Sequence, residues 1–453
     1  MATFLPESSG RPGGDDTYLT GRGPAWFAFA MTLLLMLVDY IDRQVIVSLF
    51  PHMKADWGLS DKQLGALVSV VSVTVALGAL PVALIADRAS RVKSIVTMAT
   101  IWSLASISCM FTRNYGQLFV ARACVGLGEA GYGSVGAALI ASVFPARMRG
   151  TLLAAFFATA SVGSVLGVLL GGLIAAKWGW QAAFGVVGFP GLLLALLYLK
   201  VRDYKTVALT PTLDQATRST GSTVAYVASS LAKSRTMLWV CLGGAAQLVV
   251  VSSVWSWLPS FLNRFHGMAP EQAAVRAALV VLVGAVGSVV WGNVIDRAGR
   301  RRPAHKLLVM ATLCIASMAV LLPTFGGTGS LAPSTQFALV ALGGFLMTCS
   351  VGPVTAIVID VIHPGVRATG ASVLALFQNL FGLAAGPFLV GVLSDAMGLD
   401  HAMTLIPISS VLAAGFFALA SRTYESDRQR VAAVAVEVTP PPAPEAAAAT
   451  AAR

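Results

Sequence analysis

Three ionisable residues within five positions of one apolar stretch are the first candidates for chemistry: Asp39, Asp42 and Arg43. If the stretch is helical, positions 39 and 43 are i,i+4 neighbours and positions 39 and 42 are i,i+3 neighbours, so the three side chains share about one face. Arg122 and Glu129 lie seven residues apart in a second apolar stretch, which again places them on one face. Ionisable groups are costly inside a membrane, so each is a candidate functional group.

The chemistry that this combination favours is proton exchange. Burial favours the protonated form of a carboxyl group, whereas a nearby arginine favours the ionised form. A carboxylate that gains or loses an arginine partner when the protein changes shape therefore changes its affinity for a proton. Glu129 is the first candidate for proton coupling, because Arg122 is the only partner visible in its own stretch; Asp42 and Asp39 follow. The alternative to proton exchange is a permanent structural salt bridge whose carboxyl group never titrates. The candidate pairs are Asp42–Arg43 and Arg122–Glu129.

The second half of the sequence offers little ionisable chemistry at depth. All five histidines lie in loops or near the ends of apolar stretches, so a histidine proton relay is not expected. Three uncharged polar residues, Gln247, Gln378 and Asn379, are candidates for hydrogen bonds to a substrate head group. A charged first half and an apolar second half favour an amphipathic substrate, whose head would contact Arg43 and Arg122.

Several enzymatic and cofactor-binding functions are excluded. The five cysteines fall inside apolar runs without paired spacing, so they predict neither a disulfide framework nor a metal site. The run Gly126–Gly131 matches the dinucleotide fingerprint, but it lies within an apolar stretch and does not follow a strand. The sequence contains no phosphate-binding GxxxxGK[ST] motif. We therefore expect no catalytic residue, no metal and no cofactor, with a proton gradient as the energy source.

The elements that must position these residues are membrane-spanning helices. Only 11% of the 453 residues are charged and 56% are hydrophobic, whereas soluble domains carry about 25% charged residues. This composition excludes an ordinary soluble enzyme, a disordered chain and a nucleic-acid-binding protein. A spanning helix needs about 20 mostly apolar residues, and twelve stretches qualify. They are 25–50, 61–86, 94–112, 115–142, 150–175, 180–200, 237–263, 272–295, 306–323, 335–361, 367–394 and 402–421.

The distribution of positive charge predicts the orientation. Most of the 31 Lys and Arg residues lie in the tails and in the loops after even-numbered helices. Loops with an excess of Lys and Arg usually face the cytoplasm. We expect an integral plasma (inner) membrane protein with both termini in the cytoplasm. The predicted segments are an N-terminal tail (1–24), a six-helix bundle (25–200), a cytoplasmic linker (201–235), a second six-helix bundle (236–421) and a disordered tail (422–453).

Repeated motifs indicate that one six-helix unit has been duplicated. The sequence ALIADRASR at 83–91 follows the second expected helix, and GNVIDRAGRR at 292–301 follows the eighth. The fifth and eleventh helices both open on a proline and an arginine. Both also carry glycines four residues apart, such as Gly163, Gly167 and Gly171, which we interpret as a helix-packing surface. In duplicated transporters, the binding site lies near the midplane between the halves.

These motifs resemble the major facilitator superfamily of transporters. The loop at 292–301 carries its complete signature, Gly-x-x-x-Asp-Arg-x-Gly-Arg-Arg, whereas Ala83 replaces the first glycine in the other half. The runs DYIDR at 39–43, RACVGLGEA at 122–130 and FPARMRG at 144–150 are similar to the Spinster branch, whose members move lysolipids and sphingoid lipids. The resemblance implies an all-α membrane protein in which twelve transmembrane helices form two pseudo-symmetric six-helix bundles.

The resemblance also implies roles for individual residues. The first and fourth helices line a central cavity in this superfamily, and Asp39 is an acid that the Spinster motif lacks. The run NLFGL at 379–383 departs from the His-x-x-Gly-Asp sequence of Spinster members. The two loop motifs and their partners imply a gate at the cytoplasmic mouth, formed by Asp87, Arg88, Arg91, Arg149, Asp296, Arg297, Arg300 and Arg367. For the arginines, the alternative is charge that only sets the topology.

The sequence therefore predicts a proton-coupled secondary transporter that works by alternating access and is not an enzyme. The expected substrate is a lysolipid- or sphingoid-like amphiphile. The expected partners are membrane lipids, this substrate and protons, and we expect a monomer that binds no nucleic acid. Two alternatives stay open: a proton-linked symporter of small organic anions, in which Arg43 or Arg122 binds the carboxylate, and a polyspecific drug exporter. The choice between symport and antiport also stays open.

Overall fold

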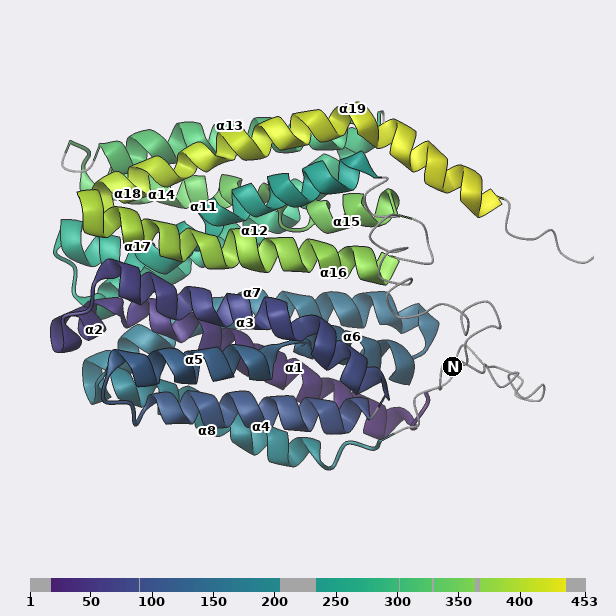
Figure 1. Ribbon diagram of the computed structural model, residues 1–453, viewed down its shortest axis with the longest axis horizontal. Helices are drawn as coiled ribbons and strands as arrows, with labels where there is room; N and C mark the ends of the chain where they lie inside the picture. Colours follow the sequence, from purple (N-terminus) through teal and green to yellow (C-terminus); the bar gives the residue numbers. More distant parts are fainter. Residues whose placement is uncertain are drawn as a thin grey trace, which may run out of the picture.

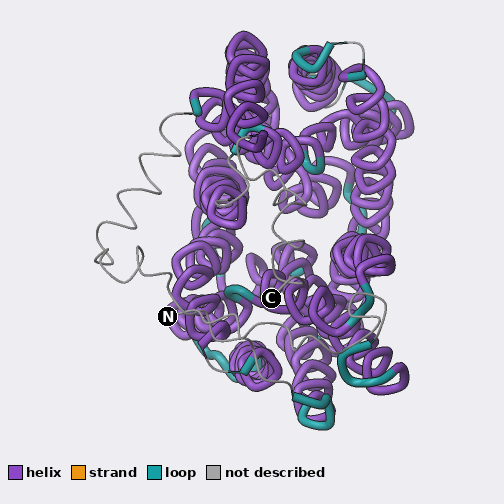
Figure 2. The backbone as a smooth tube through the Cα atoms, turned by 90° about the vertical axis from the view of Figure 1, so that its right-hand side faces the viewer, coloured by secondary structure: helices purple, strands orange, loops and turns teal. Residues whose placement is uncertain are grey.

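The structure is a bundle of helices that run along one long axis (Figure 1). The computed structural model describes residues 18–88, 90–203, 234–300, 302–327, 330–362 and 367–436. Within these ranges no strand occurs, and 12 helical segments are long and apolar enough to cross a membrane. In Figure 2 the same helices are viewed nearly end-on. The expected all-α class and the twelve spans are confirmed.

The first six spans form the N-terminal half. Within it, α1 packs against α7, and α4 packs against both α5 and α8. The helices are α1 (Arg22–Val45), α2 (Phe50–Trp57), α3 (Asp61–Arg88), α4 (Arg91–Cys109), α5 (Tyr115–Glu129), α6 (Tyr132–Val143), α7 (Ala146–Trp178) and α8 (Trp180–Tyr198), with the short 3-10 helix η1 (Ile46–Ser48) after α1.

The last six spans form the C-terminal half, which repeats the packing of the first. Here α11 packs against η4 and α17 as α1 packs against α7, and α13 packs against α14 and α19 as α4 packs against α5 and α8. The two pseudo-symmetric bundles are thus confirmed. The elements are α11 (Arg235–His266), α12 (Pro270–Gly299), α13 (His305–Gly326), α14 (Pro333–Met347), η2 (Thr348–Ser350), α15 (Pro353–Asp360), α16 (Arg367–Phe377), the π-helical η4 (Gln378–Ala384), α17 (Ala385–Met397), α18 (Leu399–Leu405), η5 (Ile406–Ile408) and α19 (Ser409–Val436).

Glycines allow the closest helix contacts within each half. A Cβ atom at Gly163 would lie 2.7 Å from the carbonyl oxygen of Leu37, so α7 approaches α1 only because this position has no side chain. In the other half, a Cβ atom at Gly386 would lie 2.7 Å from the carbonyl oxygen of Val249 on α11. The glycine spacing in the sequence therefore marks packing surfaces, as we interpreted it.

Hydrophobic cores join the two halves at one end of the bundle. We call this the Asp61 end, and the opposite end, where the described chain begins at Tyr18 and ends at Val436, the terminal end (Figure 1). One core cluster at the Asp61 end contains residues of both halves, including Phe50 and Trp257, whose ring centroids are 5.1 Å apart. The other two clusters are each confined to one half. In this conformation the halves are closed against each other at the Asp61 end.

The last helix extends further than the sequence suggested. We expected disorder after residue 421, but α19 continues to Val436. The reason is an anchor at the start of α11, where the backbone N–H of Thr236 donates to Asp427 Oδ2 at 3.0 Å. A carboxylate is favourable at a helix N-terminus, and Asp427 therefore fastens α19 to α11. The remaining parts of the expected tails and linker, residues 1–17, 204–233 and 437–453, lie outside the described residues.

Candidate functional site

The fourth span is interrupted at Glu129. We expected one helix over 115–142, but α5 ends at Glu129 and α6 begins at Tyr132. Gly131, between them, has a φ of 82°, a left-handed conformation that glycine adopts without the strain that a Cβ atom causes. Ala130 packs against α3, where a Cβ atom at Gly78 would come within 2.7 Å of the Ala130 Cβ. The break therefore fixes Glu129 at the end of α5, in the interior of the N-terminal half.

The tenth span, the counterpart of the fourth in the duplicated unit, is also interrupted. Its two parts, α14 and α15, are separated by η2 and by two residues that precede Pro353. Proline has no backbone N–H, so Pro353 cannot donate to the preceding turn, whereas it fits well as the first residue of α15. Interrupted helices at corresponding positions in the two halves of a transporter point to the binding site. Both breaks lie where the sequence places membrane-spanning residues.

Arg43 on α1 lies between two carboxyl groups. Its Nε is 2.9 Å from Glu129 Oε2 and 3.5 Å from Asp39 Oδ2. Its guanidinium also lies over the ring of Tyr40, 5.3 Å from the centroid. Asp39 and Glu129 are each 2% exposed, whereas the Arg43 side chain is 19% exposed. Arg43 is therefore the most exposed member of this group.

Arg122 on α5 pairs with Asp42 on α1. Its Nη1 is 3.8 Å from Asp42 Oδ2, and the hydroxyl of Ser106 on α4 donates to Asp42 Oδ1 at 2.6 Å. The ring of Phe184 covers the guanidinium, with the centroid 5.9 Å away. Arg122 and Asp42 are each 1% exposed.

The structure exchanges the partners that the sequence suggested. Arg43 pairs with Glu129 instead of Asp42, and Arg122 pairs with Asp42 instead of Glu129. Seven residues of helix span about 10 Å along the axis, so Arg122 and Glu129 reach across to α1 more easily than toward each other. We call these five residues the central cluster: Asp39, Asp42, Arg43, Arg122 and Glu129.

The central cluster has an unequal number of acids and bases. Three carboxyl groups and two guanidinium groups, all ionised, would sum to one net negative charge. Such a charge is unfavourable in a buried site, and a single proton removes it. Because Asp39 and Glu129 share the one guanidinium of Arg43, these two acids compete for that proton. The arrangement is chemically capable of reversible protonation.

The polar candidates of the C-terminal half are divided between two places. Gln247 is fully buried inside that half, where its Nε2 donates to the carbonyl oxygen of Met347 at 3.0 Å and to Ser317 Oγ at 3.3 Å. Its amide thus joins α11 to α13 and α14. Gln378 and Asn379 are partly exposed in the π-helical η4, and Asn379 Nδ2 donates to the carbonyl oxygen of Ala375. The structure does not bring these three residues to the central cluster.

The expected gate residues lie at the terminal end. Arg91 Nη1 donates to Ser142 Oγ at 2.8 Å, and Arg149 Nε donates to the carbonyl oxygen of Phe144 at 3.0 Å; both contacts lie within the N-terminal half. In the C-terminal half, Asp296 pairs with Lys306 at 3.2 Å, and its neighbours Arg297 and Arg300 are exposed. The side chains of Asp87, Arg88 and Arg367 lie outside the described part of the structure.

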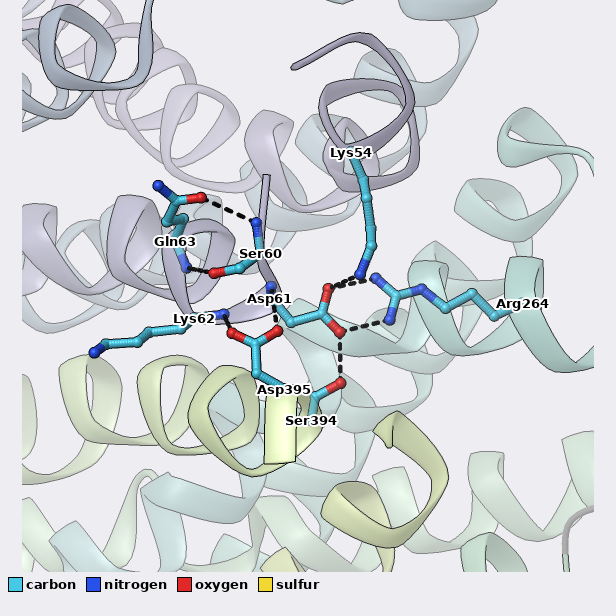
Figure 3. Close-up of polar contacts among 8 residues, drawn as sticks. All are labelled: Lys54, Ser60, Asp61, Lys62, Gln63, Arg264, Ser394 and Asp395. Carbon is cyan, nitrogen blue, oxygen red and sulfur yellow. Dashed lines mark hydrogen bonds and ion pairs between the residues drawn. The ribbon is translucent and has the colours of Figure 1, made fainter. Parts of the chain in front are cut away.

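Sequence reasoning missed a second ionic cluster, at the Asp61 end (Figure 3). Asp61, the first residue of α3, is bound by Arg264 of the C-terminal half, whose Nη1 and Nη2 lie 2.6 and 2.7 Å from its two carboxylate oxygens. Lys54 Nζ is 2.7 Å from Asp61 Oδ1, and the hydroxyl of Ser394 on α17 donates to Asp61 Oδ2. The Asp61 side chain is only 3% exposed. Its carboxylate therefore connects the two halves.

A second acid strengthens the same connection. Asp395 on α17 accepts from the backbone N–H groups of Asp61 at 2.8 Å and Lys62 at 3.0 Å, which belong to the first turn of α3. Four backbone N–H groups at a helix start lack helical partners, so a carboxylate there is stabilising. Further along α3, the hydroxyl of Ser69 donates at 2.6 Å to the carbonyl oxygen of Ala384 in η4. The contacts between the halves thus continue from the Asp61 end toward the middle.

One sequence signal marks the start of α3, but none identifies its partners. Ser60 and Gln63 exchange hydrogen bonds between side chain and backbone, the capping-box arrangement that a Ser-x-x-Gln sequence predicts. This signal places Asp61 in a first helical turn. Arg264 and Asp395 are more than 200 residues away in the chain, and nothing in one sequence pairs them with Asp61.

Comparisons with known proteins agree with the fold. The sequence profile described as Major Facilitator Superfamily matches residues 32–387. Protein spinster homolog 3 of Danio rerio is 25% identical, over 96% of this chain and 93% of that protein. The gallate transporter of Pseudomonas putida is 28% identical, over 86% of this chain and 90% of that protein. The crystal structure of a bacterial homolog to the human lysosomal transporter Spinster, inward-facing and unoccupied, superposes with a TM-score of 0.79 at 22% identity, covering 90% of this chain and 99% of that one.

Proposed function

This chain belongs to the major facilitator superfamily and resembles its Spinster branch, and from that membership we propose that it is a proton-coupled carrier of a lysolipid- or sphingoid-like amphiphile. Family membership makes it an integral membrane transporter and not an enzyme. The proposal adds the coupling ion, the class of substrate and alternating access between two membrane faces. We further propose that the carrier acts as a monomer and uses no cofactor beyond the proton gradient.

The central cluster supports proton coupling. Two carboxyl groups share Arg43, and the net charge of the buried cluster becomes zero when it binds one proton. If rocking of the halves moves α1 against α5, the distance from Arg43 to Glu129 changes, and with it the affinity of Glu129 for a proton. Proton binding is then linked to the conformation of the carrier.

One observation carries the proposed class of substrate: the buried charges are distributed unequally. Five of the buried charged residues of the described chain belong to the N-terminal half, and four of these belong to the central cluster. In the C-terminal half the buried charged residue is Asp427, near the end of α19. A small, fully charged solute would face polar partners on one side and an apolar wall on the other, which costs several kcal/mol. An amphiphile satisfies both sides, because its head contacts Arg43 and its tail contacts the apolar half.

A series of amphiphiles with one head group and increasing acyl length tests the proposed substrate. Each methylene that enters an apolar environment contributes about 0.8 kcal/mol. The apparent affinity of an amphiphile that competes for transport in proteoliposomes should therefore rise roughly fourfold per methylene until the site is filled. A lysophospholipid series and a sphingoid-base series would be compared with the isolated head groups. If the head group alone competes as well as the longest amphiphile, the lipid proposal is wrong.

A second candidate substrate is a small organic anion. The similarity to a gallate transporter favours it, as does the partly exposed guanidinium of Arg43, which can bind a carboxylate. The same proteoliposomes, loaded with a pH-sensitive dye, separate the candidates when gallate, short carboxylates and cationic drugs are added one at a time. Proton influx driven by gallate and unaffected by lysolipids would favour the anion symporter; influx or efflux driven by the drugs would favour the drug exporter.

We also propose that both termini lie in the cytoplasm of a cell whose inner membrane holds the carrier. The positive-inside distribution of Lys and Arg supports this orientation. The closed Asp61 end would then face outward. Single cysteines at Arg428 and at Lys62, both exposed and at opposite ends, test it after the exposed Cys124 is replaced by serine. An impermeant thiol reagent added to intact cells should label Lys62→Cys only; labelling of Arg428→Cys would reverse the orientation.

A further inference from the structure

A cleft of about 590 Å³ opens between the start of α13 and the later part of α19, at the terminal end. It is separate from the central cluster and from the Asp61 end. Its polar residues are Arg302 and His305 on one side and Ser421, Arg422 and Glu425 on the other, with Leu308 beside them. Arg302 and Arg422 are exposed, and within the described chain neither forms an ion pair.

The two helices beside the cleft lie on the outer side of the bundle. Helices α13 and α19 pack against each other along the edge of the C-terminal half that is farthest from the N-terminal half (Figure 1). Large apolar side chains on both helices are exposed there, which is expected where a helix contacts lipid tails. Along α13 these are Leu308 and Ile315, at 43% and 39%, and along α19 they are Leu412 and Leu419, at 61% and 38%.

The position of the cleft along α13 and α19 matches a membrane interface. Residues 409–420 of α19 are almost all apolar, and the charged residues begin at Arg422. On α13 the apolar span begins at His305, three residues after Arg302. The basic groups therefore lie at the level where lipid tails give way to head groups, and the apolar strip of α13 and α19 extends from them into the membrane.

From these observations we infer that the cleft between α13 and α19 binds the head group of an anionic phospholipid, with its acyl chains along the exposed apolar strip. Arg302, in the loop before α13, and Arg422, on α19, approach from two sides and supply charge-assisted donors to the phosphodiester. His305 and Ser421 offer further hydrogen bonds. Glu425 accepts a hydrogen bond from a head group that carries hydroxyls, which makes phosphatidylglycerol a better occupant than an anionic lipid whose head group has no hydroxyl beyond its phosphate.

Native mass spectrometry of the full-length protein tests this inference. Phosphatidylglycerol and phosphatidylcholine with identical acyl chains would be titrated separately into the detergent-solubilised protein. We expect phosphatidylglycerol to bind at least tenfold more tightly than phosphatidylcholine and to raise the midpoint of thermal unfolding. The double variant Arg302→Ala/Arg422→Ala should lose at least tenfold in affinity for phosphatidylglycerol and also lose the thermal shift.

Two further variants separate this cleft from other lipid contacts. Lys200→Ala/Arg428→Ala removes the same charge from exposed positions at the same end, and Arg428 lies on a different face of α19 from Arg422. Glu129→Gln alters the central cluster, where the proposed substrate binds. Both should bind phosphatidylglycerol as the unaltered protein does. Equal binding of the two lipids, an equal loss in the Lys200/Arg428 variant, or a loss confined to Glu129→Gln would each overturn the inference. So would full competition by glycerol phosphate, which has no acyl chain.

Discussion

Arg43 holds two carboxyl groups with one guanidinium, and this unequal count gives the central cluster its capacity for a proton. Substituting Glu129 by glutamine should keep the size of the side chain and remove one acid, so that the ionised cluster is neutral without a proton. We expect Glu129→Gln to fold and insert normally but to lose uphill, proton-driven transport while retaining exchange of substrate at equal concentrations. Transport assays with and without a pH gradient measure both activities.

The control for this substitution is Glu271→Gln, which removes an acid from the start of α12, outside the central cluster. It should retain both activities. Full proton-driven transport by Glu129→Gln would move the coupling role to Asp42 or Asp39.

The two arginines of the central cluster should differ in what they do. Arg43 is partly exposed, whereas Arg122 is 1% exposed beneath Phe184. We expect Arg43→Ala to weaken anionic substrates at least tenfold more than neutral ones. Arg122→Ala should instead lower stability by about 3 kcal/mol, because it leaves Asp42 buried without its partner.

A double variant distinguishes these roles. Adding Asp42→Asn to Arg122→Ala removes the unpaired acid and should recover much of the lost thermal stability, measured as the midpoint of unfolding in detergent. If Arg122→Ala leaves stability unchanged and selects against anionic substrates as Arg43→Ala does, then both arginines contact substrate.

Among the elements, the break between α5 and α6 positions Glu129, and Gly131 makes the break possible. Replacing Gly131 by alanine places a Cβ atom at a φ of 82° and 3.1 Å from Val82 Cγ1. We expect a loss of about 1–2 kcal/mol in stability from the left-handed conformation alone. The matched control is Gly133→Ala, two residues further in α6, where an added Cβ meets no atom within 4 Å. That control should be neutral or slightly stabilising, since alanine is the better helix former; equal losses in the two variants would contradict this account of the break.

The elements also show how much of the structure can be predicted from a single sequence. Hydrophobic runs predicted all twelve spans because each is long, apolar and ended by charge, proline or glycine. The helix break was missed because Gly131 lies among several other glycines, and composition does not reveal which of them adopts a positive φ. The pairs Arg43–Glu129 and Arg122–Asp42 were missed because they join different helices, and helical spacing orders only the residues within one helix. The partners of Asp61 were missed for the same reason, because Arg264 and Asp395 lie on distant helices.

At the scale of the whole molecule, Asp61 is the main polar contact that holds the two halves together at one end. Asp61→Asn removes the charge that binds Arg264 and Lys54. These partners are partly exposed, so we expect a loss on the order of 2 kcal/mol in the closed state, which shifts the balance of closed and open forms about thirtyfold. Spin labels at Trp178 and Met397, exposed residues that end α7 and α17 at this end, report the separation of the halves.

Wild-type protein should give one short distance between these labels, and Asp61→Asn should add a longer one. Asp56→Asn is the control, because Asp56 lies at the same end but its carboxylate accepts from Trp180 within the N-terminal half. A distance distribution that is the same in all three proteins would mean that apolar packing alone keeps this end closed.

In the proposed transport cycle, the apolar core that both halves share at the Asp61 end would also affect the rate. Opening this end would wet Phe50, Trp257 and their neighbours, which are almost completely dry in the closed form. Wetting apolar surface is unfavourable in proportion to its area. An empty carrier would bear that cost alone, whereas a bound acyl tail lying against these rings would keep water out during the movement. A bound apolar substrate would then lower the free-energy barrier to opening this end, and loaded carriers would reorient faster than empty ones.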